Sequence, residues 1–347
     1  MNNQKVLVTG GAGFIGSTLV ESFLRDGAQV TVVDNFDPFY DPAVKWSNLS
    51  RALQSPRFRL LNLDIRNLDA LRTKARDEYQ VIVHLAAKAG VRPSINDPVS
   101  YYEVNVGGTQ NLLAVAHEWN VPQFVFASSS SVYGVNPNVP WREDDHVLKP
   151  ISPYASTKVS GELLGHVYSH LFGMRFIALR FFTVFGPRQR PDLAINKFAR
   201  LISSGTPIPF YGSGDSRRDY TFVDDIVAGI RAAARYTGSM YEIFNLGNNR
   251  TVSLAELVSA LEDILGVRAI LDKQPEQLGD VPQTWADISK ARELLGYAPQ
   301  TEIYGGLRKF VEWQNRQSSL HTVKPEPRLC PVVNNLHSEL GEAAQLR

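Results

Sequence analysis

A tyrosine and a lysine stand one helical turn apart in Tyr154-Ala-Ser-Thr-Lys158, and the serine run Ser128 to Ser131 precedes them. Residues at this spacing share one face of a helix, so the two side chains should lie together. A lysine cation beside a phenol favours the phenolate, which predicts a Tyr154 pKa well below its ordinary value of about 10. Ser129 is placed to hold a substrate hydroxyl against that phenolate. The predicted chemistry is removal of a proton from an alcohol, and it requires a nearby hydride acceptor.

The N-terminal residues predict a binding site for such an acceptor. An apolar strand from Lys5 to Thr9 leads directly into Gly10-Gly11-Ala12-Gly13-Phe14-Ile15-Gly16, and an amphipathic helix follows to Asp26. The next strand, residues 29–34, ends in an acid. A strand, a glycine turn, a helix and a strand that ends in an acid form the dinucleotide-binding βαβ unit.

Each glycine of this unit has an expected task. We expect Gly10 to make the turn, Gly13 to let a pyrophosphate approach the backbone, and Gly16 to let the helix pack closely. Asp34 is placed to accept hydrogen bonds from an adenosine ribose. A 2′-phosphate would be repelled by this carboxylate, so the sequence favours NAD over NADP.

Strand and helix patterns alternate through the first half of the chain. The fold class predicted is α/β, a Rossmann-type doubly wound parallel sheet with a smaller mixed α/β substrate domain. Ligands should then bind at the carboxyl ends of the strands. The expected division is a cofactor domain over 1–183 with 219–250 returning to it, a nucleotide-sugar domain over 184–218 and 251–316, and a loose tail over 317–347.

Further residues at strand ends are expected to contact the cofactor. Asp64 and Ile65 follow one strand and could hold the adenine, while the small Ala86 and Ala87 leave room at the end of another. The full set expected to bind NAD is Gly10, Gly13, Phe14, Ile15, Gly16, Asp34, Asn35, Asp64, Ile65, Leu85, Ala86, Ala87, Lys88, Asn105, Tyr154 and Lys158.

Composition limits the class of protein. The 347 residues are 44% hydrophobic and 20% charged with a formal net charge of +1, which gives no field to attract nucleic acid or an anionic membrane. One cysteine excludes an internal disulfide, and the seven histidines show no metal-ligand spacing, so we predict no metal. With neither a signal-peptide pattern nor a long apolar run, the sequence predicts a soluble cytoplasmic protein.

The glycine spacing, Ser129 and the Tyr154/Lys158 pair together resemble the extended short-chain dehydrogenase/reductase superfamily, and within it the NAD-dependent nucleotide-sugar epimerases and dehydratases. The resemblance covers about residues 4 to 316. It implies that Arg218 and Asp280 bind the diphosphate of a nucleotide sugar, that NAD is held tightly and recycled, and that the protein is a homodimer.

Three positions select a subgroup within the resemblance. Dehydratases of the family carry glutamate where this chain has Ser131, so dehydration is not expected. UDP-galactose 4-epimerases carry asparagine at the position of Thr183 and arginine at that of Gln277. Thr183, Gln277 and the segment 34–41 resemble UDP-glucuronate 4-epimerases, although Leu278 replaces an expected proline.

An acidic sugar also suits the residue types. Several hydroxyl donors and the Arg190 cation can hold a carboxylate through charge-assisted hydrogen bonds. The expected substrate-binding residues are Ser129, Ser130, Ser131, Thr183, Arg190, Tyr211, Arg218, Gln277 and Asp280.

The reaction that the resemblance implies is interconversion of UDP-glucuronate and UDP-galacturonate. In this hypothesis Tyr154, with Lys158 and Ser129 beside it, takes the 4-hydroxyl proton while C4 gives hydride to NAD, and the transient 4-keto sugar turns over before reduction. Two alternatives remain open, a UDP-glucose/UDP-galactose 4-epimerase and a non-catalytic NAD-binding sensor or scaffold.

Overall fold

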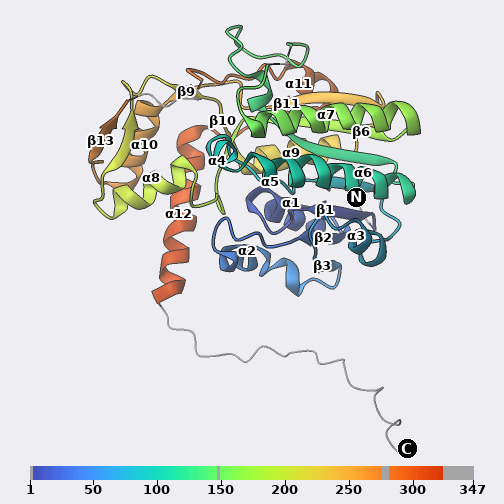
Figure 1. The fold of residues 1–347 in the computed structure, drawn as a ribbon. Coiled ribbons are helices and arrows are strands. Elements are labelled where there is room, and N and C mark those ends of the chain that lie inside the picture. Colours follow the sequence, from blue (N-terminus) through green and yellow to red (C-terminus); the bar gives the residue numbers. More distant parts are fainter. Residues whose placement is uncertain (1–2, 147–148, 276–280, 323–347) are drawn as a thin grey trace, which may run out of the picture.

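The computed structural model describes residues 3–146, 149–275 and 281–322, and it is built around a seven-stranded parallel sheet (Figure 1). In spatial order the strands are β11 (Tyr241–Leu246), β6 (Arg175–Phe181), β5 (Gln123–Ser129), β4 (Val81–His84), β1 (Lys5–Thr9), β2 (Gln29–Asp34) and β3 (Phe58–Asn62). The chain order reverses between β1 and β4, which is where a doubly wound sheet opens a crevice for ligands.

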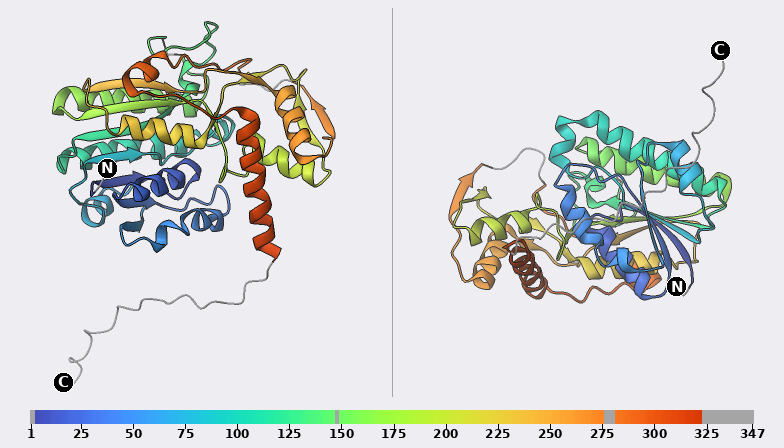
Figure 2. Two further views of the ribbon diagram at one scale, coloured as in Figure 1. Left: turned by 180° about the vertical axis from the view of Figure 1, so that it is seen from behind. Right: turned by 90° about the horizontal axis from the view of Figure 1, so that it is seen from below.

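The sheet is buried on both faces because successive side chains enter different cores. In β1, Val6 and Val8 belong to one hydrophobic cluster and Leu7 to the other, and β5 divides Val125 from Phe124 in the same way. This explains why the strands read as continuous apolar runs instead of alternating ones. The view from below in Figure 2 shows helices on both sides of the sheet.

The covering helices follow from their apolar faces. Helices α1 (Phe14–Arg25) and α9 (Val223–Ala233) contribute to the first cluster, and α3 (Leu68–Lys74) and α6 (Gly108–Glu118) to the second. The remaining helices are α2 (Pro42–Leu49), α4 (Val91–Asn96), α5 (Pro98–Tyr102), α7 (Pro153–Phe172), α8 (Ala194–Ser203), α10 (Leu254–Leu265), α11 (Ser289–Leu295) and α12 (Ile303–Thr322), with short turns η1 (Ala52–Gln54), η2 (Glu103–Gly107) and η3 (Ser130–Tyr133).

Besides the large sheet, the described residues form three two-stranded sheets. They are β7 (Thr183–Phe185) with β10 (Tyr220–Phe222), β9 (Arg217–Arg218) with β12 (Val252–Ser253), and β8 (Ile208–Tyr211) with β13 (Leu271–Gln274). Figure 1 shows α8, α10 and β13 gathered at one side of the large sheet, with α12 alongside. Helix α12 runs to Thr322, past residue 317 where the sequence predicted a loose tail, and 323–347 lie outside the described residues.

The helix that carries the Tyr/Lys pair has clear local signals at both ends. Ser152 caps α7 by accepting a hydrogen bond from the Ala155 amide at 3.1 Å, Pro153 occupies the first turn, and Gly173 ends the helix in the left-handed conformation. These signals explain why the helix begins at Pro153 and ends at Phe172. Within the described residues, no helix combines the length and apolar character that crossing a membrane requires.

Candidate active site

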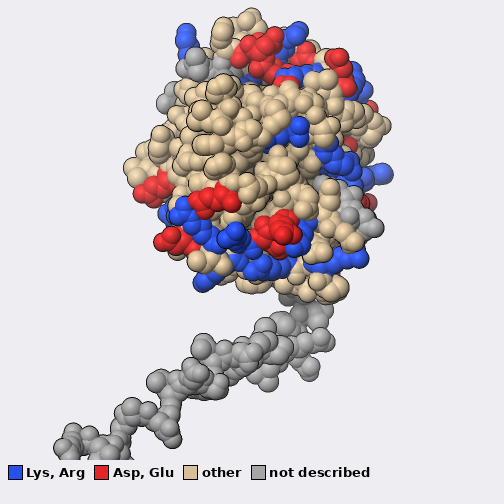
Figure 3. Space-filling view, turned by 90° about the vertical axis from the view of Figure 1, so that its right-hand side faces the viewer, with Lys and Arg blue, Asp and Glu red and all other residues tan. Residues whose placement is uncertain are grey.

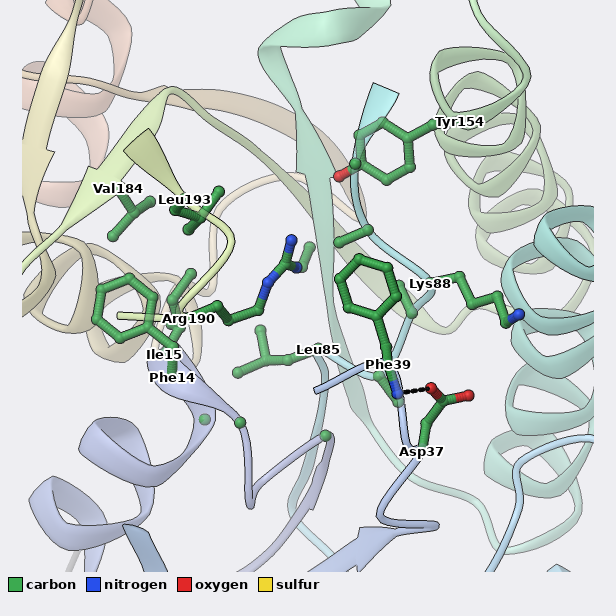
Figure 4. Close-up of a pocket in the computed structure, with 18 of the residues that line it drawn as sticks. Phe14, Ile15, Asp37, Phe39, Leu85, Lys88, Tyr154, Val184, Arg190 and Leu193 are labelled. Atoms are coloured by element: carbon green, nitrogen blue, oxygen red, sulfur yellow. Dashed lines mark hydrogen bonds between the residues drawn. The ribbon is translucent and has the colours of Figure 1, made fainter. Parts of the chain in front are cut away.

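A cavity of about 820 Å³ lies at the carboxyl ends of the central strands and extends to the small strand pairs (Figure 4). Of the residues expected to bind NAD, all except Asn105 line it. Of those expected to bind substrate, Thr183, Arg190 and Arg218 line it, whereas Ser129, Ser130, Ser131 and Tyr211 do not. Gln277 and Asp280 lie outside the described residues.

The glycine loop has the shape that a dinucleotide requires. Gly10 adopts a φ of +71°, and its amide donates to the Val33 carbonyl at 2.8 Å, which joins the loop to β2. Helix α1 begins at Phe14 with neither a side-chain cap nor an acid in its first turn. The backbone N–H groups of that turn are therefore available to an anion at the cavity wall, which fits the pyrophosphate of NAD.

Asp34 is buried at the end of β2 and already accepts two backbone hydrogen bonds. Its Oδ2 accepts from the Ala12 amide at 3.0 Å and its Oδ1 from the Phe36 amide at 2.9 Å. Nζ of Lys45, a lining residue that the sequence analysis missed, lies 3.9 Å from Oδ1. Each carboxylate oxygen retains a lone pair for a ribose hydroxyl, and Lys45 balances the charge.

The segment after β2 is held by short side-chain turns. The side chains of Asn35, Asp37 and Asp41 each accept from the backbone amide two residues further on, at 2.8 to 3.1 Å. Such Asx turns fix a loop without regular secondary structure. The loop carries Phe39 and Tyr40 into the cavity wall, where the sequence analysis assigned no residue.

At the adenine end of the cavity, polar side chains are paired with one another. Asp64 accepts from Asn35 Nδ2 at 3.1 Å and forms an ion pair with Arg66, whose hydrogen bonds lower the Asp64 pKa to about 2. Its side chain is thus committed, and the neighbouring Ile65 lines the cavity while its side chain packs in the second hydrophobic cluster.

Asn105 acts from behind the cavity wall. Its Oδ1 accepts from the Lys88 amide at 2.8 Å, and its Nδ2 donates to the Lys88 carbonyl and to Thr157. The Lys88 side chain turns away from the cavity centre and donates to Asp97 and Ser100 (Figure 4). The Lys88 ammonium is therefore already paired, and Asn105 fixes the backbone of this cavity-lining residue.

The Tyr/Lys pair and the serine strand meet as expected. Tyr154 points into the cavity (Figure 4), and a hydrogen bond with the Ser129 side chain acts on its hydroxyl. Lys158 is 4% exposed, and its Nζ donates to the Ala127 carbonyl at 2.7 Å, 5.8 Å from the centre of the Tyr154 ring. Ser129 also donates to Ser131 and accepts from the Ser131 amide, so the serine run is ordered by its own hydroxyls.

The expected lowering of the Tyr154 pKa by Lys158 is wrong for this structure. Burial raises the pKa of Tyr154, and the influences that oppose burial are the hydrogen bond with Ser129 and the charge of Arg190. Burial likewise lowers the pKa of Lys158 to about 8, against the raising effect of Glu162. The sequence shows which charges are near a phenol but not how deeply both groups are desolvated.

A buried ion pair supports the serine strand from below. Arg180 donates to Glu162 at 3.0 and 2.8 Å, and both side chains are almost fully buried. Ser128, a lining residue, donates to the same Glu162 carboxylate at 2.5 Å. Glu162 is one turn beyond Lys158 on α7, so one helix face carries the tyrosine, the lysine and this acid in sequence.

Some of the residues expected to bind substrate line the cavity, and some lining residues were not expected from the sequence. The Arg190 side chain enters the cavity opposite Tyr154 (Figure 4). Thr183 and Arg218 also line the cavity. Tyr211 lies outside the lining, with its ring 5.6 Å from the Cζ of Arg92, a lining residue that the sequence analysis did not identify. Nothing in the sequence between them indicates that α4 and β8 meet here.

His84 supports the glycine loop from within the sheet, as a hydrogen-bonded residue. Thr109 Oγ1 donates to the Asn105 carbonyl, so it accepts from His84 Nε2 at 2.9 Å, and Nδ1 then accepts from Thr9 at 2.7 Å. Burial and the charge of Lys158 lower the His84 pKa to about 3.

The lowered pKa of His84 predicts that the fold loses stability in acid. Because the folded pKa lies below the ordinary value of about 6.5, His84 stabilises the fold fully above that pH, and the contribution is lost as the pH falls toward 3. By pH 5 the expected loss is roughly 2 kcal/mol. Urea unfolding should show that the free energy of unfolding falls more between pH 7 and pH 5 in the wild type than in His84→Gln. Equal pH slopes in the two proteins would contradict this role.

Comparison with known proteins places the chain in a family. The model of the NAD dependent epimerase/dehydratase family matches residues 6–247. A UDP-glucuronate 4-epimerase of Thermodesulfobacterium geofontis is 40% identical over 318 residues, covering 90% of this chain and 97% of the relative.

Solved structures agree with this placement. UDP-glucuronic acid 4-epimerase from Bacillus cereus, in complex with UDP-glucuronic acid and NAD, has a TM-score of 0.85 at 35% identity and covers 90% of this chain and 100% of its own. UDP-glucose 4-epimerase of Thermotoga maritima, with UDP-glucose, has a TM-score of 0.83 at 30% identity, covering 91% and 100%.

Proposed function

The chain belongs to the NAD dependent epimerase/dehydratase family, and from this premise we propose that it is an NAD-dependent isomerase that interconverts UDP-glucuronate and UDP-galacturonate at C4. The observation that carries the choice of an acidic sugar is Arg190, a cation only 18% exposed that enters the cavity opposite Tyr154. Arg190 already pairs with Asp192, but a neutral hydroxymethyl group would offer this partly buried guanidinium no further charge, whereas a sugar carboxylate would.

Tyr154 is proposed as the group that moves the proton. Its Oη takes the proton from the sugar 4-hydroxyl, and Ser129, which is hydrogen-bonded to Tyr154, keeps the 4-oxygen in line. Because burial raises the Tyr154 pKa, the phenolate once formed is a strong base, and the charge of Arg190 offsets part of the cost of forming it. Lys158, anchored on the Ala127 carbonyl, supplies a second cation near the ring.

NAD bound in this cavity would supply reversible hydride transfer at C4, with no net oxidation of the sugar. The residues proposed to hold it are the glycine loop, the first turn of α1, Asp34 and the backbone beside Asn105. Arg218 is proposed to anchor the diphosphate while the sugar turns. A cofactor that is recycled must be retained, which suits a cavity this deep.

The carboxylate of the sugar exposes the 4-keto intermediate to loss of carbon dioxide. A 4-keto glucuronate is a β-keto acid, and it loses carbon dioxide when its carboxylate bond aligns with the carbonyl π system. Arg190 and Thr183, both at the cavity wall, are proposed to hold the carboxylate out of that alignment.

The experiment that tests the function needs no added cofactor. Purified protein incubated with UDP-glucuronate alone should yield UDP-galacturonate at a constant final ratio, resolved by chromatography, without release of NADH. Conversion of UDP-glucose but not of UDP-glucuronate would overturn the acidic substrate and leave a neutral 4-epimerase. Retained NAD with no turnover of either sugar would leave a binding protein instead of an enzyme.

The domain division stays a proposal that strand pairing supports. Strand β11 extends the large sheet beside β6, so residues 219–250 are proposed to belong with 1–183. Residues 184–218 and 251–316 are proposed as the nucleotide-sugar domain. A cytoplasmic location is proposed because UDP-sugars and NAD are cytoplasmic metabolites, and fractionation of the native source tests it.

The outer face of α7 supports a homodimer. The charged residues of this helix, Lys158 and Glu162, are both buried, whereas Leu163, Val167 and Leu171 are 45–63% exposed at successive turns. On the neighbouring α5, Val99 and Tyr102 are 68% and 57% exposed. Figure 3 shows a broad area without charged side chains on one side of the molecule. An apolar helical face of this size is typical of a subunit interface.

The dimer predicts a specific effect of one charge. Val167→Lys should shift the mass measured by light scattering from dimer to monomer, because a lysine at the middle of the stripe would be desolvated in the interface. Val267, an exposed residue just after α10, gives the matched control: Val267→Lys should leave the mass unchanged. A monomeric wild type would refute the interface.

A further inference from the structure

Arg190 is already paired with a carboxylate of its own loop. Its Nε donates to Asp192 Oδ1 at 2.9 Å and its Nη2 to Asp192 Oδ2 at 2.7 Å, so the two groups meet in a bidentate, fork-like pair. This is the geometry in which a guanidinium binds any carboxylate. The pair lies only partly in solvent, since the side chains are 18% and 37% exposed.

The guanidinium is also held on its face. The Cζ of Arg190 lies 5.4 Å from the centre of the Phe39 ring, and Phe39 comes from the turn-stabilised loop after β2. Among the described residues, no hydrogen bond uses Nη1 of Arg190. Asp192 therefore binds the Nε/Nη2 edge of the guanidinium, Phe39 stacks on one face, and Nη1 remains for a ligand in the cavity.

The charge of Asp192 reaches the cavity. Burial raises the pKa of Tyr101 to about 12, and among the nearby charges Arg190 acts to lower this pKa and Asp192 to raise it. The same two charges act in the same directions on the pKa of Tyr40. Both tyrosines line the cavity. A sugar carboxylate placed beside Arg190 would therefore experience the anion as well as the cation.

We propose that Asp192 shares Arg190 with the sugar carboxylate, as a built-in carboxylate whose charge weakens binding of the acidic sugar and which still holds the guanidinium when the sugar carboxylate leaves it. The proposal rests on the function proposed above and makes Asp192 a positioning residue, because it acts through Arg190. The 4-keto sugar must turn over within the site, so its carboxylate must change neighbours during each cycle. A partly buried arginine without a second partner would hold the carboxylate and slow that step.

Two effects of Asp192 oppose each other, and one is larger. Its hydrogen bonds orient Arg190, which favours sugar binding, while its negative charge repels the sugar carboxylate. Orientation survives without Asp192, because Arg190 is mostly buried and rests on Phe39. The repulsion between two anions that share one cation has no such substitute, so removal of the charge should tighten binding.

The test compares Asp192→Asn with the wild type, both carrying their retained NAD. Asp192→Asn should bind UDP-glucuronate about five- to tenfold more tightly by calorimetry, a modest factor because the pair is partly solvated. Binding of UDP-glucose should stay within about twofold, since it has no carboxylate. The kcat for UDP-glucuronate should fall along with KM, a combination that mere loosening of the loop does not produce.

The control is an ion pair between this loop and helix α1. Arg188 Nη2 donates to Glu21 at 2.5 Å, so Glu21→Gln removes a comparable ion pair next to Arg190 without touching it, and it should leave the ratio of the two affinities unchanged. In an Arg190→Met background, Asp192→Asn should no longer affect that ratio.

Two results would overturn the proposal. One is unchanged or weaker binding of UDP-glucuronate relative to UDP-glucose in Asp192→Asn. The other is an equal effect of Asp192→Asn in the Arg190→Met background. If the wild type neither binds nor converts UDP-glucuronate, the proposed function fails together with this inference. If the wild type converts UDP-glucuronate but the affinity ratio does not move, only the inference fails.

Discussion

Replacement of Tyr154 by phenylalanine should lower kcat for UDP-glucuronate by about a thousandfold, because it removes the group that transfers the 4-hydroxyl proton and leaves the rest of the site in place. The ring packs edge-on against Tyr101 at 6.3 Å, and phenylalanine preserves that contact. Retained NAD and the affinity for UDP-glucuronate should stay within a few-fold of the wild type. The measurement is product formation by chromatography together with calorimetric binding.

A tyrosine on the same helix provides the control. Tyr168 accepts a hydrogen bond from Gln110 at 2.6 Å, so Tyr168→Phe removes a hydroxyl from α7 without reaching the cavity, and activity should be near normal. Activity of Tyr154→Phe within tenfold of the wild type would assign the proton transfer to another group. A loss of NAD in the same variant would show that the hydroxyl holds the cofactor instead.

Replacement of Gly16 by alanine should yield protein without NAD. A Cβ at this position would lie 2.2 Å from the Gly10 carbonyl oxygen and 2.8 Å from the Gly11 Cα, which are backbone atoms of the loop itself. Such overpacking costs about 1–3 kcal/mol in stability and can be relieved only by moving the loop. The N–H groups of the first turn of α1 then no longer face the cavity as they do now.

The cofactor content is measured from the nucleotide released on heating. Gly107→Ala is the matched control, because a Cβ there meets nothing within 4 Å and the residue is helical. It should retain NAD and gain or lose little stability. Full NAD content in Gly16→Ala would contradict the close approach of α1 to the glycine loop.

The sequence predicted the parts of the site that depend on local order. The unit from Lys5 to Asp34 is one continuous segment, and the spacing of its glycines follows directly from its geometry. The helical pairing of Tyr154 and Lys158 is of the same kind, because Ser152, Pro153 and Gly173 mark the ends of α7 within the local sequence. The seven-stranded parallel sheet confirms the predicted fold class.

The rest depends on contacts between distant segments. Lys45 reaches Asp34 only because Asx turns fold the chain back after β2, and Arg92 meets Tyr211 only when α4 and β8 come together. The Tyr154 pKa was predicted in the wrong direction because burial is a property of the whole fold. Asn105 was assigned to the cofactor, but its amide serves the backbone of Lys88.

The place of β11 at the end of the sheet constrains how the protein can be made. Strand β6 is complete at Phe181, but its outer neighbour begins only at Tyr241. During synthesis, β6 is therefore an edge strand, paired with β5 on one side only and with apolar side chains on both faces, until the intervening segment has left the ribosome. A fragment that ends near residue 183 should aggregate when expressed alone, so the cofactor-binding half cannot be produced as an independent unit.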